Sequence, residues 1–281
     1  MTIAVTAATG HLGRIVVEKL KAMLPAGQVV ALARTPAKAG DLGVEVRAGD
    51  YERPDQLVAS LAGVETLLLI SSSEVGKRAA QHRNVIDAAR KAGVRRIVYT
   101  SLLRADTSPL GLASEHVETE KMLRDSGVPF TLLRNGWYME NHTGSLPGAV
   151  AAGMLIGCAG QGRIAGALRE DYAQAAVVAL TGSGHEGRTY ELAGDAPYTL
   201  ADLAAQASRC AGKEIPYRDL PAADYAKALE GFGLPAPLAA AIASWDADAA
   251  RGALFDEGHA LSRLIGRPTA PLSVAVEQAL R

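Results

Sequence analysis

Cysteine is scarce in this chain. The 281 residues include two cysteines, Cys158 and Cys210, and neither belongs to a C-x-x-C pair. Closely spaced cysteines are the usual sequence sign of a zinc site or a disulfide framework, so neither is indicated. The sequence instead favours two isolated, buried thiols in a reducing compartment. The sequence therefore predicts no bound metal.

An excess of charge of one sign is also missing. The chain carries 29 Lys and Arg against 30 Asp and Glu, for a formal net charge of -1. A general binder of nucleic acid needs a basic surplus to displace the counterions of the phosphates. Nucleic-acid partners are therefore not expected.

Long apolar runs are absent as well. No uncharged stretch approaches the roughly 20 residues that a membrane-spanning helix requires. The first ten residues are typical of a strand and a turn, whereas a secretory segment would have a basic start and a longer apolar run. We therefore expect a cytoplasmic protein with no membrane partner.

Six apolar, β-rich runs alternate with helical patterns in the first half of the chain. The helical pattern at 11–24 stops at Pro25, and those at 79–93 and 113–127 each end at a glycine. Apolar strands that alternate with helices form parallel sheets covered on both faces. The sequence predicts an α/β fold with a doubly wound Rossmann sheet, whose strands lie at 2–6, 28–34, 44–50, 64–72, 95–101 and 129–135.

Beyond about residue 142 the pattern changes, because Ala, Gly and Pro become frequent and helical patterns dominate. We expect a Rossmann domain at 1–142 and a smaller, mostly helical lobe at 143–281 over the carboxyl ends of the strands. Some segments of the second half should return to the Rossmann sheet. Helices are predicted at 170–181, 199–211, 221–230, 235–250 and 271–280, with short extended pieces at 187–194 and 214–220.

The segment VTAATGHLG (5–13) links the first predicted strand to the first helix. Glycine at such a turn lets backbone N–H groups and the helix N-terminus approach a pyrophosphate. Gly10 would permit that approach and Gly13 would allow the helix to pack closely on the strand; an ordinary turn with two glycines is the alternative. Ala7 occupies a position where glycine is usual. Alanine is tolerated there at negative φ, whereas a left-handed conformation would cost about 1–2 kcal/mol.

The end of the second predicted strand indicates which dinucleotide binds. An acidic residue there bonds the ribose hydroxyls of NAD, whereas an arginine suits the 2′-phosphate of NADP. Arg34 ends this strand, Lys38 follows one helical turn later, and the first acidic residue is Asp41. Two cations near the expected phosphate favour NADPH, and the alternative is that Arg34 is a solvated charge at a strand end.

A familiar catalytic motif is missing. Short-chain dehydrogenases protonate an alkoxide with Tyr-x-x-x-Lys, but none of the eight tyrosines here has Lys four residues later. The corresponding helix carries His116 and Glu120 on one face. This pair could move a proton, or it could be a structural pair facing the sixth strand, which we favour. Hydride addition to a quinone gives a stabilised phenolate-like anion, so an acceptor of that kind needs only correct placement against the nicotinamide.

Two segments follow strands at the sheet edge where the cofactor is expected. Ser71, Ser72 and Ser73 follow the fourth strand. Trp137 and Tyr138, after the sixth strand, offer flat faces for an aromatic substrate or belong to the core. The residues expected to border the nicotinamide after the sixth strand are Asn135, Gly136, Trp137, Tyr138, Met139, Glu140 and Asn141.

Longer runs carry a family resemblance. LLLISSSEVG, QHRNVIDAA, YTSLLRADTSPLGLASEHVETEKMLRDSG and TLLRNGWYMEN closely resemble the bacterial NADPH:quinone oxidoreductases of the NmrA-like, atypical short-chain dehydrogenase family, which are related to triarylmethane dye reductases. The likeness continues through HEGRTYELAGD (185–195) and LSRLIGRPT (261–269), so it covers nearly the whole chain. The resemblance implies an enzyme that uses neither flavin nor metal. The chain departs from it at Ala7, where relatives have glycine, which puts the cofactor affinity in question.

The resemblance also implies roles for individual residues. Arg34 would face the 2′-phosphate, and Asn141 would orient an acceptor oxygen; Asn141 and Tyr138 are the candidate catalytic residues. The pyrophosphate would lie against Ala7, Ala8, Thr9, Gly10, His11 and Leu12. The nicotinamide side would be lined by Ser71, Ser72, Ser73, Asn135, Gly136, Trp137, Tyr138, Met139 and Glu140, with Arg169 nearby from the second lobe.

The leading interpretation is an NADPH-dependent quinone reductase that transfers hydride directly to a small-molecule quinone. One alternative is a non-enzymatic NADP(H)-sensing regulator of the NmrA type, which the missing Tyr-x-x-x-Lys motif suits equally well. Another is a dye reductase with the same fold. A homodimer is one candidate assembly.

Overall fold

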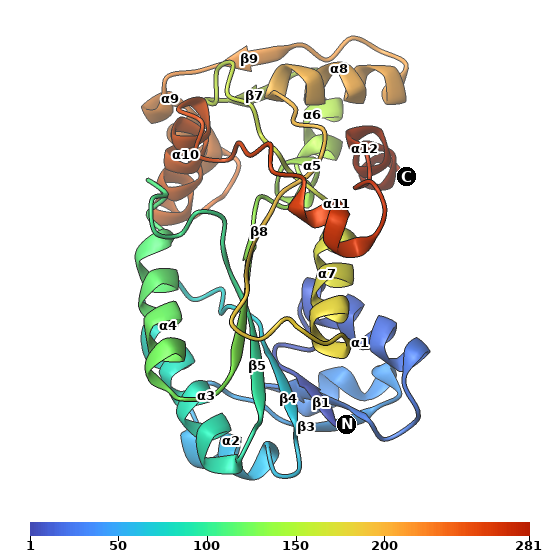
Figure 1. Ribbon diagram of the computed structural model, residues 1–281. Coiled ribbons are helices and arrows are strands. Elements are labelled where there is room, and N and C mark those ends of the chain that lie inside the picture. The colour runs from blue at the N-terminus through green and yellow to red at the C-terminus, as the bar shows by residue number, and fades with distance from the viewer. The chain divides into compact units, whose positions relative to one another are not determined.

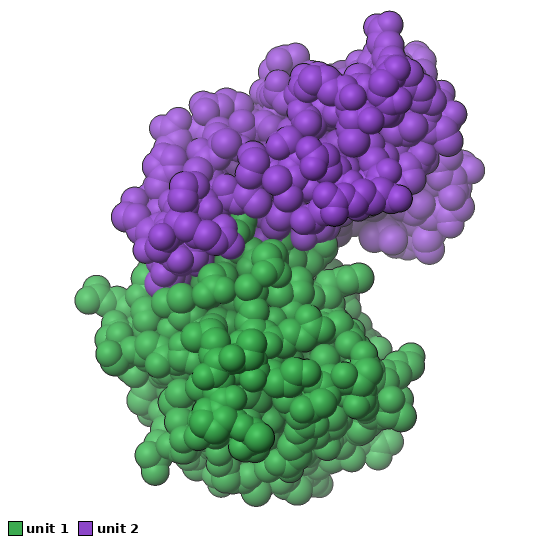
Figure 2. Space-filling view, turned by 90° about the vertical axis from the view of Figure 1, so that its right-hand side faces the viewer, with its two compact units in different colours: residues 1–106, 112–135, 169–192 green, residues 107–111, 136–168, 193–281 purple.

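The computed structural model describes residues 1–281, which form two compact units. Unit 1 comprises 1–106, 112–135 and 169–192, and unit 2 comprises 107–111, 136–168 and 193–281 (Figure 2). The units interleave along the chain, so a single cut after residue 142 does not describe them. The functional division at 142 therefore stays a prediction.

Unit 1 is built on a seven-stranded sheet in the order β3-β2-β1-β4-β5-β6-β8 (Figure 1). All neighbouring strands pair in parallel. This order, with the first six strands predicted from the sequence, confirms the doubly wound Rossmann sheet. The strands are β1 (Ile3–Val5), β2 (Val29–Ala33), β3 (Glu45–Ala48), β4 (Thr66–Leu69), β5 (Arg96–Leu102), β6 (Phe130–Asn135) and β8 (Thr189–Leu192).

Helices cover both faces of this sheet, as the fully buried central strands require. Helices α2 (Pro54–Ser60), α3 (Arg78–Ala92) and α4 (Ala113–Asp125) pack side by side on one face. Helices α1 (His11–Met23) and α7 (Arg169–Thr181) pack together on the other (Figure 1). A 3-10 helix, η1 (Pro36–Leu42), joins β2 to β3.

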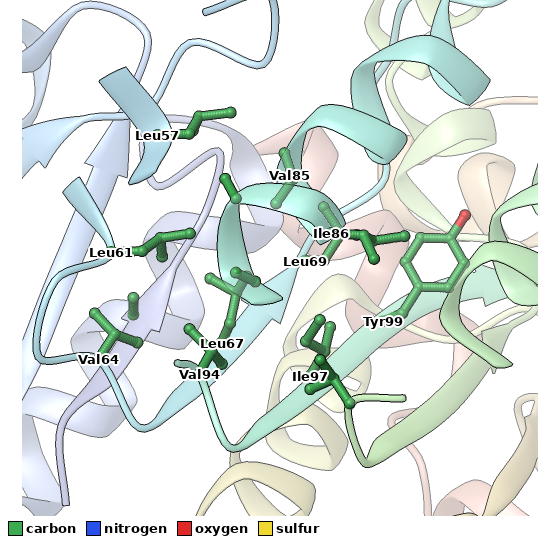
Figure 3. Packing of buried hydrophobic residues seen from close by; sticks show 14 of the residues in the cluster. Leu57, Leu61, Val64, Leu67, Leu69, Val85, Ile86, Val94, Ile97 and Tyr99 are labelled. Carbon is green, nitrogen blue, oxygen red and sulfur yellow. The ribbon is translucent and has the colours of Figure 1, made fainter. Parts of the chain in front are cut away.

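One face of the sheet supplies the core shown in Figure 3. Leu57 of α2, Leu61 at its C-cap and Val85 of α3 meet Leu67 and Leu69 of β4 there, all fully buried. Each such leucine or valine stabilises the fold by about 1.5–3 kcal/mol relative to leaving it in water. The core therefore fixes the strand ends from which the candidate site is built.

The seventh strand comes from the second half of the chain. The sequence predicts that some segments of this half return to the Rossmann sheet but does not say which, and the extended piece at 187–194 is one of them, because β8 pairs with β6 at the edge of the main sheet. Only Leu192 of this short strand is buried. A half-exposed edge strand lacks the continuous apolar run by which the inner strands are recognised. Its place follows from α7, which crosses back to the sheet before it.

Unit 2 is mostly helical and contains one small parallel pair of strands, β7 (Leu155–Gly157) and β9 (Tyr217–Asp219). Thr199 and Asp202 form a capping box that starts α8, which packs on α12. No helix in either unit is long and apolar enough to cross a membrane. The helices of unit 2 are α5 (Glu140–Thr143), α6 (Leu146–Ala152), α8 (Leu200–Ala211), α9 (Ala222–Gly231), α10 (Ala236–Ala250), α11 (Ala260–Ile265) and α12 (Leu272–Leu280).

Candidate functional site

The β1–α1 turn has an unusual backbone at Ala7. This residue lies in the left-handed region with φ 48°, so the second of the two cases considered for Ala7 applies. The conformation costs an alanine about 1–2 kcal/mol relative to glycine. It is held by the Gly10 N–H, which donates to the Ala7 carbonyl oxygen at 2.9 Å.

Gly13 explains how the helix approaches this turn so closely. A Cβ atom at Gly13 would lie 2.3 Å from the Ala7 carbonyl oxygen. That distance is impossible for real atoms, and backbone atoms on both sides leave nothing flexible to move away. The glycine is therefore required for α1 to pack on the end of β1.

The N-terminus of α1 is suited to an anion. Gly10 is its N-cap, no side chain caps it, and its first turn contains no acidic residue. Thr9, Gly10 and His11 are exposed, while Ala8 and Leu12 are buried. Uncapped N–H groups and the positive end of the helix dipole favour a phosphate at this place. The residues at 7–12 therefore fit the pyrophosphate of a dinucleotide.

Arg34 follows β2 directly and is exposed, and Lys38 on η1 is exposed too. Arg34 Nη1 lies 2.8 Å from Glu74 Oε1 in the loop after β4. Asp41, the nearest acidic residue along the chain, is engaged by Arg14 of α1 at 2.6 Å. Two cations, Arg34 and Lys38, thus lie exposed at the end of β2, and Arg34 is paired with Glu74.

The β4–α3 loop, residues 70–77, carries Ser71, Ser72 and Ser73. The Ser71 N–H donates to Thr100 Oγ1 at 2.9 Å, and the Ser72 N–H donates to His82 Nε2 at 3.0 Å. Arg78 Nε donates to the Ser72 carbonyl oxygen at 2.5 Å. The loop is therefore fixed by side chains that come from β5 and α3.

The hydrogen bonds of His82 settle its tautomer. Nε2 accepts from the Ser72 N–H, so the ring proton is on Nδ1, which lies 2.9 Å from Thr119 Oγ1. The Thr119 hydroxyl in turn donates to the Glu115 carbonyl oxygen at 2.8 Å. Burial, and secondarily His116 and Arg78, lower the pKa of His82 to about 3. His82 is therefore neutral at physiological pH and holds the loop as an acceptor.

Glu115 and Thr6 complete the support of this loop. Glu115 Oε1 accepts from the Gly76 and Arg78 N–H groups at 3.1 and 3.0 Å, which caps the start of α3. Thr6 Oγ1 accepts from the Ile70 N–H at 2.9 Å and lies 2.6 Å from the buried Tyr51 hydroxyl. The sequence analysis identified none of these supports of the loop. Buried polar residues on apolar helix faces, such as His82, are the one signal that could have revealed them.

His116 and Glu120 do not act as a pair. The His116 Nδ1 lies 2.7 Å from the Tyr99 hydroxyl, and burial lowers the pKa of His116 to about 3. Glu120 forms a two-bond ion pair with Arg134 of β6, with both contacts at 2.8 Å. Burial alone would raise the pKa of Glu120, but the bonds from Arg134 and Ser101 outweigh it and lower that pKa. Each residue has structural partners, and Glu120 meets the sixth strand as expected, but the two residues bind different partners rather than each other.

Two more predicted residues belong to unit 1. Asn135 ends β6, is buried, and accepts a bond from the Leu103 N–H at its carbonyl oxygen, 2.9 Å away. Arg169, which the sequence places in the second lobe, begins α7 and is part of unit 1. This is a second consequence of the return of 169–192 to the Rossmann sheet.

The remaining predicted residues lie at the start of a segment of unit 2. The Met139 N–H donates to the Ala167 carbonyl oxygen at 2.9 Å, and the Ala167 N–H donates to the Trp137 carbonyl oxygen at 3.1 Å. Trp137 is 9% exposed and meets Trp245 edge-on with ring centres 5.9 Å apart. It therefore belongs to the core of unit 2. Gly136, Tyr138 and Glu140 are half-buried, Met139 is buried and Asn141 is exposed.

His142, which follows Asn141, anchors this segment. Its Nδ1 lies 3.0 Å from the Tyr198 hydroxyl, and its Nε2 lies 3.8 Å from Asp246 Oδ1. Asp246 also accepts a hydrogen bond from the Cys158 N–H at 3.1 Å. The segment that carries Asn141 is thus tied to Asp246 of α10 and to Tyr198, two residues before α8.

The chain resembles known proteins over most of its length. Residues 7–189 match a family described as NAD(P)H-binding. The chain belongs to this family. The matched residues run from the strained turn at Ala7 to the first residue of β8.

Individual relatives are similar over their full length. The chain is 56% identical over 277 residues to quinone oxidoreductase 2 of Escherichia coli (strain K12), covering 98% of this chain and 97% of that one. A structure of NADPH-dependent quinone oxidoreductase from Escherichia coli in complex with NADPH is 54% identical, with a TM-score of 0.96 and full coverage of both chains. Triphenylmethane reductase of Citrobacter sp. complexed with NADP(H) is 36% identical, with a TM-score of 0.95 and coverage of 99% and 100%.

Proposed function

We propose that this protein is an NADPH-dependent quinone reductase that transfers hydride directly from the nicotinamide to a quinone, with no flavin or metal. The observation that carries the proposal is the 56% identity to quinone oxidoreductase 2 over 98% of the chain. The uncapped α1 N-terminus and the cations after β2 support it independently, because they suit the pyrophosphate and the 2′-phosphate of NADPH.

In this proposal each predicted residue has a binding or orienting role. Residues 7–12 hold the pyrophosphate and Arg34 holds the 2′-phosphate. Bound NADPH supplies the hydride. Asn141 orients an acceptor oxygen, and Tyr138 offers a flat face to the acceptor. The residues assigned to the nicotinamide side are Ser71, Ser72, Ser73, Asn135 and Arg169 of unit 1 and Gly136, Tyr138, Met139 and Glu140 of unit 2. Trp137, which was also predicted there, belongs to the core of unit 2.

The buried polar groups of unit 1 favour an acceptor that needs no tailored acid. His82 and His116, with pKa values of about 3, are uncharged at neutral pH, so neither is an imidazolium that could serve as a general acid. Burial also raises the pKa of Tyr99 and of Tyr51. A reduced quinone is a stabilised anion that water can protonate, so correct placement is sufficient.

Purified protein mixed with NADPH and 1,4-benzoquinone tests the proposal. We expect oxidation of NADPH well above the uncatalysed rate, followed at the nicotinamide absorbance. Binding of NADPH without turnover would contradict it and would indicate an NADP(H)-sensing regulator instead. A triphenylmethane dye as the better acceptor would favour the dye reductase, which the 36% identity to triphenylmethane reductase keeps as second candidate.

Replacement of Asn141 tests the site at the quinone. Asn141→Ala should lower quinone turnover about tenfold or more, because a fixed polar partner of the acceptor oxygen contributes a few kcal/mol to the transition state. The dissociation constant of NADPH should be nearly unchanged. Unchanged turnover would remove Asn141 from the mechanism.

The proposal includes the setting of the enzyme. A cytoplasmic location is supported by two free cysteines, which fit a reducing compartment; Cys158 is buried as expected, whereas Cys210 is exposed. The near balance of charge, 29 basic against 30 acidic residues, supports a small-molecule substrate and no nucleic-acid partner. A homodimer is the candidate assembly, and light scattering of the purified protein would measure it.

A further inference from the structure

Arg34 is paired with a carboxylate from another loop. Its Nη1 lies 2.8 Å from Glu74 Oε1 in the β4–α3 loop, and its side chain is 71% exposed. The partner lies 40 residues away along the chain, so the contact is made by the fold rather than by local sequence. The group proposed to bind a 2′-phosphate thus already holds an anion.

Glu74 is itself held in place. Its N–H donates to Ser72 Oγ at 3.1 Å, and its second carboxylate oxygen lies 3.3 Å from Lys77 Nζ. Bonds from Lys77 first and Arg34 second lower the pKa of Glu74, so it is charged at neutral pH. Lys77 also contacts Glu52 at 3.2 Å. Glu74 therefore keeps one cationic partner when Arg34 turns away.

We propose that Glu74 is a specificity-determining residue that competes with the cofactor's 2′-phosphate for Arg34. The inference rests on the proposed function, in which Arg34 binds that phosphate. A phosphate dianion displaces a carboxylate from a guanidinium, because it offers more charge and more acceptor oxygens. A 2′-hydroxyl offers neither the charge nor the additional acceptor oxygens, so Arg34 stays paired with Glu74 when the cofactor is NADH.

Asp41 shows why Glu74 is the relevant competitor. Asp41 is closer to Arg34 in sequence, but it forms two bonds with Arg14, at 2.6 and 3.3 Å. Glu74 is the acidic residue that contacts Arg34 directly. Removal of the Glu74 charge should therefore release Arg34 for the phosphate.

Glu74→Gln should lower the dissociation constant of NADPH about two- to five-fold and leave that of NADH nearly unchanged. The size follows from the modest strength of exposed ion pairs. The effect should vanish in the Arg34→Gln background, where there is no guanidinium to release. Glu52→Gln is the matched control, because it removes the same charge beside Lys77 without touching Arg34, and it should leave both constants unchanged.

Nicotinamide fluorescence titrations of the four proteins of the Arg34/Glu74 double-mutant cycle, with NADPH and with NADH, test the inference. The inference is supported if Glu74→Gln lowers the dissociation constant of NADPH only, and only when Arg34 is present. The inference is overturned if Glu74→Gln does not lower the dissociation constant of NADPH, or lowers it equally with Arg34 and with Gln at position 34. The proposed function stays intact in that case if Arg34→Gln still raises the dissociation constant of NADPH more than that of NADH. Equal weakening of both cofactors by Arg34→Gln would instead contradict the 2′-phosphate role, and absence of NADPH binding by the unmodified protein would contradict the proposed function.

Discussion

The β1–α1 turn and the β4–α3 loop lie at the carboxyl ends of two neighbouring parallel strands of the unit 1 sheet, and they are held in different ways. In the turn, backbone meets backbone: Gly13 packs on the Ala7 carbonyl, and no side chain caps α1. In the loop, Thr100, His82 and Arg78 bind the main chain of the serines. No side chain occupies the N-terminus of α1, whereas the N–H groups of Ser71 and Ser72 in the loop are bound by side chains that fix its shape.

The same contrast explains what the sequence could predict. The turn is formed by consecutive residues, so its glycine spacing is visible in the sequence. The loop is held by residues 29 positions away at Thr100 and 10 positions away at His82. No local pattern records which distant side chain will meet a backbone N–H group. The serines were therefore predicted as part of the site, and their supports were not.

The fold shows the same limit. The five inner strands are almost entirely buried, and each end of the six predicted strands lies within three residues of its observed position. The extended piece at 187–194 was predicted, but its place at the sheet edge was not, because this short, half-exposed run lies among the helical patterns of the second half. The sequence also left open whether Ala7 has a negative or a positive φ, because an alanine can adopt the left-handed conformation at a moderate cost.

The largest expected effect is a pH dependence of the folding stability that comes from His82, which supports the loop and not the turn. The folded pKa of His82 is about 3, below the ordinary 6.5, so the unfolded chain takes up the proton first. Stability that is fully present above about pH 6.5 is therefore lost as the pH falls toward 3, by up to about 1.4 kcal/mol for each pH unit. His116 contributes in the same direction.

His82→Gln isolates the loop's share of this pH dependence. Glutamine keeps an acceptor for the Ser72 N–H and is not protonated. Urea unfolding from about pH 6 to about pH 4 should show a shallower loss of stability than the unmodified protein, by about 1.4 kcal/mol for each pH unit. Parallel curves would show that His82 is not buried as a neutral acceptor.

A smaller loss is expected when the turn is overpacked. Gly13→Ala puts a methyl group 2.3 Å from the Ala7 carbonyl oxygen, and the turn must move. Thermal unfolding should show a loss of about 1–3 kcal/mol, as for other overpacked sites, and NADPH should bind more weakly. Gly148→Ala is the control, since nothing lies within 4 Å of a Cβ there. Equal stability of the two variants would refute the close packing of α1 on the turn.

The smallest expected effect is the gain in folding stability when the strained backbone of Ala7 in the turn is relieved. Ala7→Gly should stabilise the protein by about 0.5–1 kcal/mol, because the gain at φ 48° exceeds the entropy cost of glycine. Ala8→Gly, at a fully buried position without positive φ, should destabilise it. Destabilisation by both changes would contradict the left-handed assignment of Ala7.

The most direct test of the central claim is a single-turnover reaction of the flavin-free protein with 1,4-benzoquinone and NADPH carrying deuterium at one or the other C4 position. Direct transfer from a fixed nicotinamide predicts one NADPH oxidised for each quinone reduced, with the step slowed by deuterium at only one of the two positions. Oxidation no faster than in the absence of protein, or equal slowing from both positions, would contradict it.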